Sequence, residues 1–373
     1  MKTVRRLLYT DVLTSVAFVA VSFLALFFFI DVVDELERVG RGGYEVQHAL
    51  FHCLLLLPGH LYELMPIAVL IGTIYAMARM AQSSEFTILR TSGLGPVAAL
   101  GLLMGLAVAF AVLTFVVGDY VAPFTDQQAQ MVKAEARGSS YGRTGAWLKD
   151  RRATPDGDHT YSIQIQSVST KGELKEVRIF EFDPDARLIS RVAAGAAKIG
   201  TDAQGKTVWH LAQVERSSWH PLDGTNELVV TDDKLSSLDW TSTLTQAVVT
   251  AAIRPLGTMS AVDLFRYMTH LADNEQAAQR YEIQFWKKTL YPLACLVMVA
   301  LALPFAYLHG RSGGISLKVF GGIMLGISFV LLNNISTHVG LLQNWTPWVA
   351  AATPSAVYLM ISLLAFNWLV RHR

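Results

Sequence analysis

Cysteine is almost absent from this sequence, which has only Cys53 and Cys295 among its 373 residues. Both lie inside apolar runs, so we expect them to pack as small hydrophobic side chains rather than to form a disulfide. The ten histidines show no spacing typical of a metal site. The sequence therefore argues against a disulfide-stabilised secreted domain and predicts no metal site.

Charged residues are also scarce. Lys, Arg, Asp and Glu make up 16% of the chain, well below the ~25% typical of soluble domains. The formal net charge is +1, so no overall field favours nucleic acid as a partner. Hydrophobic residues reach 52% and the mean hydropathy is +0.35. These values are typical of a multi-pass membrane protein.

Long apolar runs occur in two groups. At ~1.5 Å per residue, an uncharged run from Val12 to Ile30 nearly crosses a hydrocarbon core of ~30 Å. The second run contains Pro58 and Pro66, which we expect to kink the helix or to restart it. The runs cover residues 12–30, 51–78 and 97–117, then 289–308, 317–342 and 347–370. The sequence thus predicts three membrane helices within residues 1–118 and three more within 285–373.

The region from 119 to 284 has a different character. Short β-type runs alternate there with turn sequences such as Asp183–Ala186 and Asp202–Gly205. We therefore expect an antiparallel β domain, a sandwich or jelly roll, over about residues 138–256. After it, Ser260 and Asp263 form a capping box that predicts the start of a helix. The predicted fold is a six-helix membrane protein (3+3) with an inserted antiparallel β domain.

A short polar segment interrupts the first group of spans. Residues 83–92 read as a small amphipathic helix that Ser83 or Ser84 caps and that Gly93 ends. Phe86, with Leu89 and Arg90 at helical spacing, is expected to rest on the membrane helices. Ser84 and Glu85 then face outward, towards another protein. Such a helix needs packing on both sides, and it is typical of the coupling helix through which a transporter receives force from an ATPase.

Basic residues predict the orientation. Those in the loops at one end of the spans are Lys2, Arg5, Arg6, Arg79, Arg90, Arg311, Lys318, Arg371 and Arg373. The positive-inside rule places both termini and the 83–92 helix in the cytoplasm and the β domain outside. Lys287 and Lys288 fall on the other side, next to a large translocated domain, where the rule is weak.

Two motif matches do not predict enzymatic sites. Residues 200–207 fit the P-loop pattern, but a strand-like sequence follows where the motif needs a helix. We interpret them as a hairpin turn. Residues 310–314 fit G-x-S-x-G, but they join two membrane helices, whereas a nucleophile elbow joins a strand to a helix. We therefore expect a non-catalytic chain without a cofactor, and any ATP would be bound by a partner.

Several polar residues allow two interpretations. Asn333, Asn334 and His338 lie at helical spacing in the fifth span, where hydrogen bonding between helices is the plainer interpretation and a functional role the alternative. Glu63 is either an interfacial residue or a functional intramembrane carboxylate. A further set consists either of scattered solvated charges or of binders for an anionic lipid headgroup; it comprises Arg38, Arg41, Lys133 and Arg137.

The order of these features resembles that of a known family. Four segments carry the resemblance: 33–44, 80–93, 118–123 and 280–286. In sequence they read VDELERVGRGGY, MAQSSE with TSG, GDYVAP and RYEIQFW. Over the whole chain the sequence resembles the LptF/LptG family of lipopolysaccharide export permeases, and these segments match its LptG branch more closely.

The resemblance implies an inner-membrane protein of a Gram-negative bacterium that extracts lipopolysaccharide. It implies a heterodimer with an LptF-like permease, a cytoplasmic LptB-like ATPase dimer, and periplasmic LptC-like and LptA-like proteins that receive the lipid. Glu85 would contact the ATPase. The first and fifth spans would form a lateral gate, for which the candidates are Phe27, Ile30, Leu325 and Phe329.

One departure from the family affects the headgroup site. LptG relatives carry lysines around the outer end of the first span, where this chain has Asp31 and Glu37 and keeps Arg38. The expected headgroup contacts therefore shift towards Lys133. Two alternative functions remain, a lipoprotein-release permease, which usually has four spans, and a membrane sensor with a ligand-binding β domain. A sensor would not need an exposed coupling helix.

Overall fold

The computed structural model describes residues 2–40, 43–136, 146–155, 157–169, 172–202, 205–221, 228–253, 255–273, 278–307 and 314–371. Contacts divide the chain into two compact units. The first, which we call the helical unit, comprises Met1–Glu37, Cys53–Asp126 and Glu282–Arg373. The second, the sheet unit, comprises Arg38–His52 and Gln127–Tyr281.

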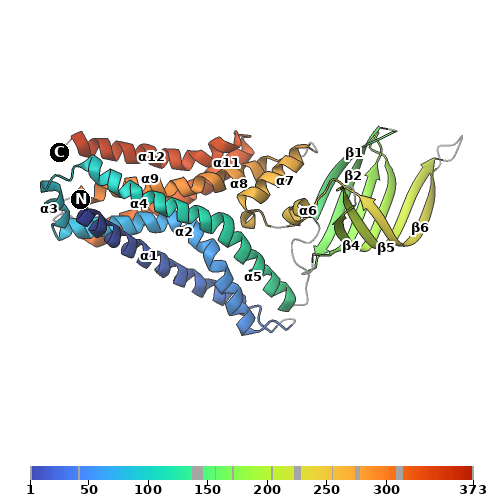
Figure 1. Cartoon of the computed structure of the whole chain (residues 1–373), viewed down its shortest axis with the longest axis horizontal. Helices are drawn as coiled ribbons and strands as arrows, with labels where there is room; N and C mark the ends of the chain where they lie inside the picture. The colour runs from blue at the N-terminus through green and yellow to red at the C-terminus, as the bar shows by residue number, and fades with distance from the viewer. Residues whose placement is uncertain are drawn as a thin grey trace. The chain divides into compact units, whose positions relative to one another are not determined.

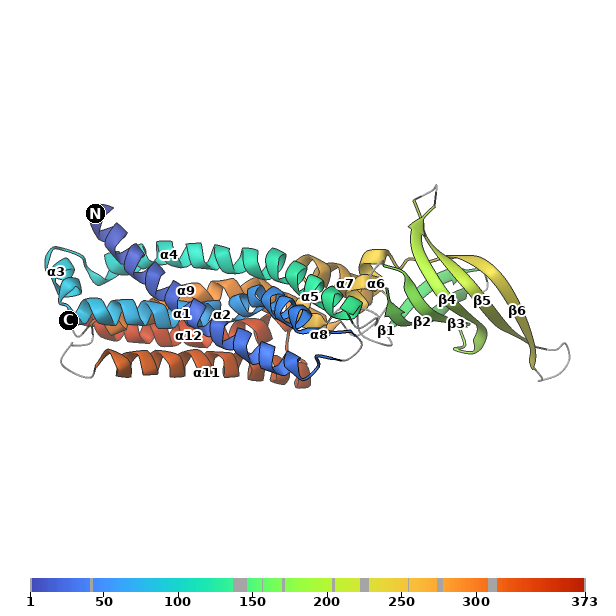
Figure 2. The same cartoon turned by 90° about the horizontal axis from the view of Figure 1, so that it is seen from below.

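Helices that run side by side build the helical unit (Figures 1 and 2). They are α1 (Lys2–Leu36), most of α2 (Val46–Gln82), the short α3 (Glu85–Thr91), α4 (Pro96–Val116), most of α8 (Gln279–Leu290), α9 (Ala294–Ala302), the short α10 (Pro304–Tyr307), α11 (Ile315–Leu342) and α12 (Pro347–Arg371). The helix α5 (Ala122–Ala136) begins in this unit and belongs to the sheet unit from Gln127 onward. A π-helical turn, Val117–Val121, joins α4 to α5, so the third span continues as one long helical rod. A 3₁₀ turn, Tyr291–Leu293, joins α8 to α9.

The prediction of six spans is confirmed. Within the described part of the chain, six helical segments are long and apolar enough to cross a membrane: Val4–Leu36, Val46–Gln82, Pro96–Ala136, Gln279–Tyr307, Ile315–Leu342 and Pro347–Trp368. Of the two outcomes expected at the prolines, a kink or a restart, the restart is wrong, because α2 continues through both Pro58 and Pro66. Each proline removes one backbone hydrogen bond, and dense packing around Pro66 holds the helix together, since the adjacent Met65 is almost fully buried.

Close helix contacts hold the helical unit together. Leu8, Val12 and Val16 of α1 join the main apolar cluster. A Cβ at Gly72 of α2 would lie 2.6 Å from the Val16 Cα atom, so only glycine permits this approach. In the most apolar window of each span, 11% of the residues are buried for α1 but 50% for the α8–α10 span. The first span therefore leaves most of its surface to lipid or to a partner.

The sheet unit contains one six-stranded antiparallel sheet. Its strands are β1 (Ala146–Thr154), β2 (Gly157–Val168), β3 (Leu174–Phe182), β4 (Leu188–Thr201), β5 (Thr207–Pro221) and β6 (Leu228–Thr241). They pair in sequence order, β1 to β6, so each described strand neighbours the next one in the chain. Period-2 alternation puts Ile163, Ile179 and Trp209 into its core. The inserted antiparallel β domain is thus confirmed. A jelly roll in the strict sense has Greek-key crossings, whereas this strand order is a simple meander.

A buried carboxylate links the first strand to the segment after the last. Asp150 of β1 is 0% exposed and accepts hydrogen bonds from the Ser242 hydroxyl at 3.0 Å and from the Thr243 amide at 3.3 Å. Arg152 also donates to it, at 3.3 Å, and lies over the ring of Trp240. We call these residues the Asp150 clamp. It ties β1 to residues 242–243 although the two are distant in sequence.

A second polar cluster lies between β2, β3 and β4. Glu181 accepts hydrogen bonds from His159 at 3.0 Å, Tyr161 at 2.7 Å and Ser190 at 2.8 Å. Burial alone would raise the pKa of Glu181, but these hydrogen bonds outweigh it and lower the pKa. Burial, with the hydrogen bond to Glu181, raises the pKa of Tyr161 to about 12.

Among the described residues, two short α-helices follow the sheet, α6 (Gln246–Ile253) and α7 (Ala261–Asp273), with a 3₁₀ turn, Leu256–Thr258, between them. The capping box predicted for α7 is present. The Ser260 hydroxyl accepts from the Asp263 amide at 3.1 Å, and the Asp263 carboxylate accepts from the Ser260 amide at 3.4 Å.

Candidate functional site

The candidate site begins at the short helix α3, which follows α2 after a two-residue turn. The expected serine cap is wrong. Ser84 has a left-handed backbone (φ 66°) and makes no capping side-chain hydrogen bond. The Ser83 hydroxyl donates to the Met80 carbonyl, and the Ser83 amide donates to the Arg79 carbonyl at 2.9 Å. The turn is therefore held by the last turn of α2 rather than by a cap on α3.

The C-terminal end of α3 is capped at Gly93, as the sequence predicts. Gly93 has φ 102°, and its amide donates to the Arg90 carbonyl while the Leu94 amide donates to the Leu89 carbonyl. This pair of bonds is the Schellman motif, which requires a residue that tolerates the left-handed region. Gly93 thus gives α3 a defined end.

One side of α3 is fixed to the helical unit. Phe86 is 3% exposed, and its ring meets the Tyr307 ring edge-on with centroids 5.0 Å apart. The Arg90 guanidinium lies 6.0 Å from the centre of the same ring. Because Phe86 belongs to the main apolar cluster, α3 packs directly onto the helices of this unit.

The other side of α3 is exposed. Ser84 and Glu85 lie on it, as predicted, with Glu85 in the first turn of the helix. Sequence reasoning missed Ile88, which is 62% exposed on the same helix. Its spacing of three residues from Glu85 is the signal that could have identified it. The exposed side of α3 therefore combines a carboxylate with an apolar side chain.

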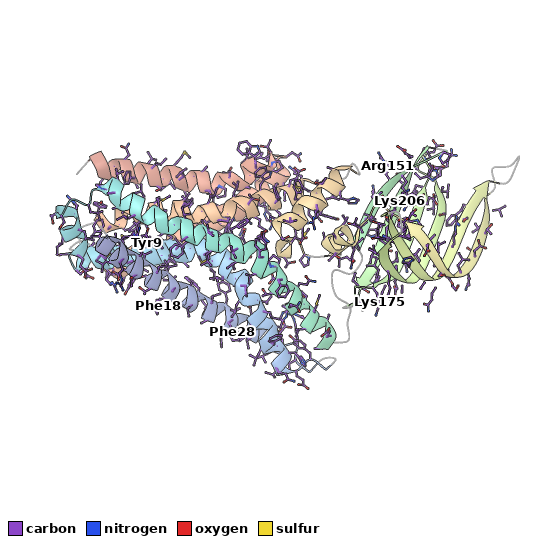
Figure 3. All side chains as sticks on the ribbon, in the orientation of Figure 1. Tyr9, Phe18, Phe28, Arg151, Lys175 and Lys206 are labelled. Atoms are coloured by element: carbon purple, nitrogen blue, oxygen red, sulfur yellow. The ribbon has the colours of Figure 1, made fainter. Side chains whose placement is uncertain are left out.

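An apolar pocket of about 530 Å³ opens between α1, α2 and α11. Its lining comprises Phe18, Val19, Ile71, Tyr75, Ile315, Ser316, Val319, Phe320 and Ile323. Figure 3 labels Phe18 and Tyr9, both on α1. The Tyr9 hydroxyl donates to the Leu102 carbonyl of α4 at 3.0 Å, which fixes the start of α1. The pocket thus brings together the first and fifth spans, the two that the resemblance implicates in lipid entry.

The four gate candidates do not line this pocket. Phe27 stacks on His60 with centroids 5.1 Å apart, and Ile30 is 43% exposed. Leu325 is half-buried against the second apolar cluster. Phe329 is 2% exposed and packs edge-on against Tyr358 of α12. The resemblance pointed to the helices that line the pocket, while the residues chosen on them lie elsewhere.

The proposed headgroup residues are only partly described. Arg38 is exposed in the turn after α1, and Lys133 is half-buried on α5. Arg41 and Arg137 lie outside the described residues, so the grouping of these four stays a prediction. Residues 310–313 of the G-x-S-x-G match lie outside as well.

The remaining polar candidates pack as ordinary helix residues. Asn333 is 9% exposed, and its carbonyl accepts from the Thr337 hydroxyl at 2.8 Å. Asn334 and His338 are exposed and hydrogen-bond to each other through the Asn334 carbonyl. The Glu63 carbonyl accepts from the Tyr291 hydroxyl, while the Glu63 side chain is exposed. The bonds of Asn333, Asn334 and His338 stay within α11 and use main-chain carbonyls, so hydrogen bonding between helices and a functional role both stay predictions.

The P-loop match is a hairpin turn, as we interpreted it. Thr201 pairs with Thr207 across the antiparallel strands β4 and β5. The Asp202 amide donates to the Lys206 carbonyl, and the Lys206 amide donates to the Asp202 carboxylate at 2.8 Å. The loop amides that would hold a phosphate in a P-loop are therefore not followed by a helix.

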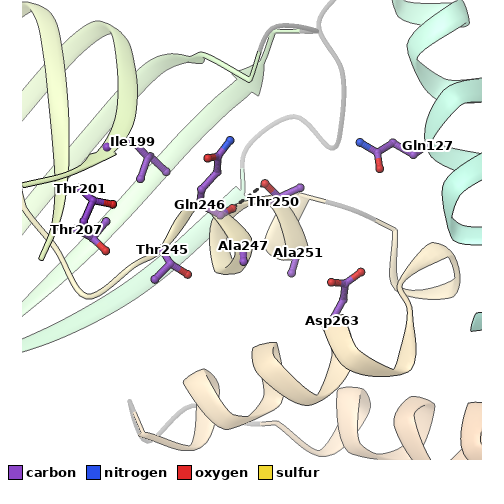
Figure 4. A pocket seen from close by; sticks show the side chains of 11 residues that line it. Gln127, Ile199, Thr201, Thr207, Thr245, Gln246, Ala247, Thr250, Ala251 and Asp263 are labelled. Carbon is purple, nitrogen blue, oxygen red and sulfur yellow. Dashed lines mark hydrogen bonds between the residues drawn. The ribbon is translucent and has the colours of Figure 1, made fainter. Parts of the chain in front are cut away.

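A second pocket, of about 650 Å³, lies at the end of the sheet near α6 (Figure 4). Threonine and glutamine side chains dominate its lining, including Thr201, Thr245 and Gln246. Its one carboxylate, Asp263, already caps α7. Among the described residues no group of histidine, cysteine and carboxylate side chains is arranged to hold a metal ion. The apolar pocket beside α1 is thus the better candidate for a lipid.

Comparisons with known proteins give a consistent result. A family model described as "Lipopolysaccharide export system permease LptF/LptG" matches residues 6–368. The chain is 30% identical to "Lipopolysaccharide export system permease protein LptG" of Escherichia coli K12 over 341 residues, which cover 91% of this chain and 90% of the relative. It is 25% identical to the protein of the same name from Haemophilus influenzae over 362 residues, 96% of each chain.

Proposed function

Because the chain belongs to the LptF/LptG family of lipopolysaccharide export system permeases, we propose that a separate ATPase drives it through α3. The observation that carries this proposal is the two-sided environment of α3. Phe86 anchors one side in the packed helices, and Glu85 with Ile88 is exposed on the other. The family match favours export of lipopolysaccharide over a sensor or a lipoprotein-release permease.

The proposed partners follow from the same features. An LptF-like permease would cover the first span, which buries little of its own surface within this chain. An LptB-like ATPase dimer would bind α3 in the cytoplasm. LptC-like and LptA-like proteins would meet the sheet, since β1 and β6 are the outer strands in the described order and an open edge accepts another strand.

The proposed lipid route starts at the pocket between α1, α2 and α11. Its lining is almost entirely apolar, so it suits acyl chains. Arg38 lies about 20 residues beyond Phe18, or ~30 Å along the helix, so the proposed headgroup residues would act at the other end of this route. The chain itself needs no cofactor for this role. Its work is to bind the lipid and to change shape when the ATPase does.

The test of this proposal is the variant Glu85→Lys. A carboxylate in the first turn of a helix gains ~0.3–1 kcal/mol from the helix dipole, so the reversal costs the fold little. At an interface, reversal of one partner of a buried charge pair costs ~2–5 kcal/mol, which is about a thirtyfold loss of affinity or more. We expect Glu85→Lys to lose the co-purifying ATPase at unchanged expression.

The matched control is Glu135→Lys, the same reversal at an exposed carboxylate of α5. This variant should keep the ATPase. Normal ATPase recovery and normal lipid export by Glu85→Lys would show that α3 is not the coupling helix.

A further inference from the structure

An ion pair joins α1 to α2 directly before α3. The Arg79 Nη2 atom lies 2.8 Å from the Asp11 Oδ1 atom. The Asp11 side chain is 16% exposed and the Arg79 side chain 49%. Arg79 stands in the last turn of α2 and Asp11 three turns into α1. The pair therefore ties the first span to the end of the helix that leads into α3.

Arg79 also holds the turn into α3 through its backbone. Its carbonyl accepts from the Ser83 amide at 2.9 Å, and α3 begins two residues later at Glu85. The Glu85 charge is among those that act on the Arg79 guanidinium. Arg79 thus contacts two elements. Its main chain holds the turn that leads into α3, and its side chain binds the first span.

The pair lies beside the apolar pocket. Tyr75 of the pocket lining precedes Arg79 by one helical turn, and Phe18 follows Asp11 by about two turns, or ~10 Å along the helix. In the same region, Val16 of α1 packs directly against the backbone of Gly72 of α2. The spacing of α1 and α2 at the ion pair therefore bears on the width of the pocket.

The exposure of Arg79 distinguishes positioning from stability. An ion pair that is half open to solvent contributes little to the free energy of unfolding, so removal of its charges should leave the fold intact. It restrains the relative position of two helices all the same, since it combines a hydrogen bond with a charge contact. An effect of this pair should therefore appear in coupling rather than in stability.

We propose that the Asp11–Arg79 ion pair is the positioning contact through which movement of α3 reaches α1 and changes the width of the lipid pocket. This inference rests on the proposed function of α3. It names the residues that link the ATPase side to the lipid side.

The test uses the neutral variants Asp11→Asn and Arg79→Gln in the complete complex, with its ATPase, in proteoliposomes. We expect each variant to retain the ATPase and to hydrolyse ATP, while lipopolysaccharide released per ATP falls about fivefold or more, the lower end of typical coupling energies. The double variant should be no worse than either single one, because both remove the same contact. Arg79→Lys, which keeps the charge, should restore most of the release.

A second measurement follows the accessibility of the pocket directly. With Phe18→Cys as a probe, the rate of reaction with an apolar maleimide should change on ATP addition in the parent complex. In Arg79→Gln this nucleotide dependence should disappear. The control is Arg6→Ala, which removes an exposed basic residue of α1 that lies more than one turn from Asp11; it should keep both release and nucleotide dependence.

The outcomes separate the two proposals. Unchanged release per ATP and unchanged probe response in both neutral variants would overturn the role of the ion pair and leave α3 untouched. Loss of the ATPase from these variants would also overturn it, because the pair would then hold the interface rather than transmit movement. If the parent complex recruits no ATPase at all, the proposed function itself fails.

Discussion

At the scale of single residues, the Asp150 clamp shows how the sheet unit holds a buried charge. The carboxylate is fully buried, and hydroxyl, amide and guanidinium donors surround it. A buried acceptor with donors of this kind is stable only while all partners remain, because each partner that is left unsatisfied costs ~1–3 kcal/mol. Asp150 is therefore a residue at which a small change should open one edge of the sheet.

We predict that Asp150→Ala opens the contact between β1 and residues 242–243. A loss of ~1–3 kcal/mol corresponds to local opening that is favoured about fivefold or more. Hydrogen–deuterium exchange of the full-length protein in detergent should show this increase at β1 and at residues 242–244. The control is Asp239→Ala, which removes an exposed carboxylate that contacts His210. Equal exchange in both variants would mean that the clamp does not hold this edge.

At the scale of elements, the C-terminal end of α3 has a specific capping motif at Gly93, whereas its N-terminal end has no side-chain cap. Gly93 adopts φ 102°, and a side chain there would meet open space. The cost of Gly93→Ala is therefore backbone strain alone, ~1–3 kcal/mol. We predict that this variant loosens the end of α3 and lowers recovery of the ATPase about fivefold or more.

Gly101→Ala is the matched control for Gly93→Ala. Gly101 lies inside α4, and an added Cβ would also meet open space there. Since alanine is favoured over glycine within a helix, ATPase recovery should not fall. A similar loss in both variants would mean that the effect comes from general damage to the spans.

The sequence predicted elements better than it predicted the site. Apolar run lengths gave the six spans, and Phe86 with Gly93 gave α3, because both depend on local patterns. The start of α3 was missed because the Arg79 carbonyl, an acceptor in the preceding helix, holds the turn. The pocket was missed because it joins residues such as Phe18 and Phe320 that are far apart in the chain. The burial of Phe329 against Tyr358 was not foreseen, because the rotation of a helix is not visible in sequence position alone.

At the scale of the whole molecule, we predict that both termini and α3 face the cytoplasm while the sheet faces outside. Single cysteines at Lys234, whose side chain is 82% exposed, and at Ile88 are suitable labelling sites. The native Cys53 and Cys295 are buried and give little background. A membrane-impermeant maleimide added to cells stripped of their outer membrane should label Lys234→Cys and not Ile88→Cys. The reverse pattern would invert the topology.

The sequential strand order has a consequence for biogenesis. A chain that crosses the membrane from its N-terminal side delivers β1 first, and each later strand finds its partner already present. Sheets with such local pairing fold fast, because little chain entropy is lost before each contact forms. The bond between Asp150 and Thr243 spans 93 residues, so it can close only after β6 has emerged. With the sheet outside, as predicted, its strands can pair in the order in which they are delivered, and the Asp150–Thr243 contact closes last.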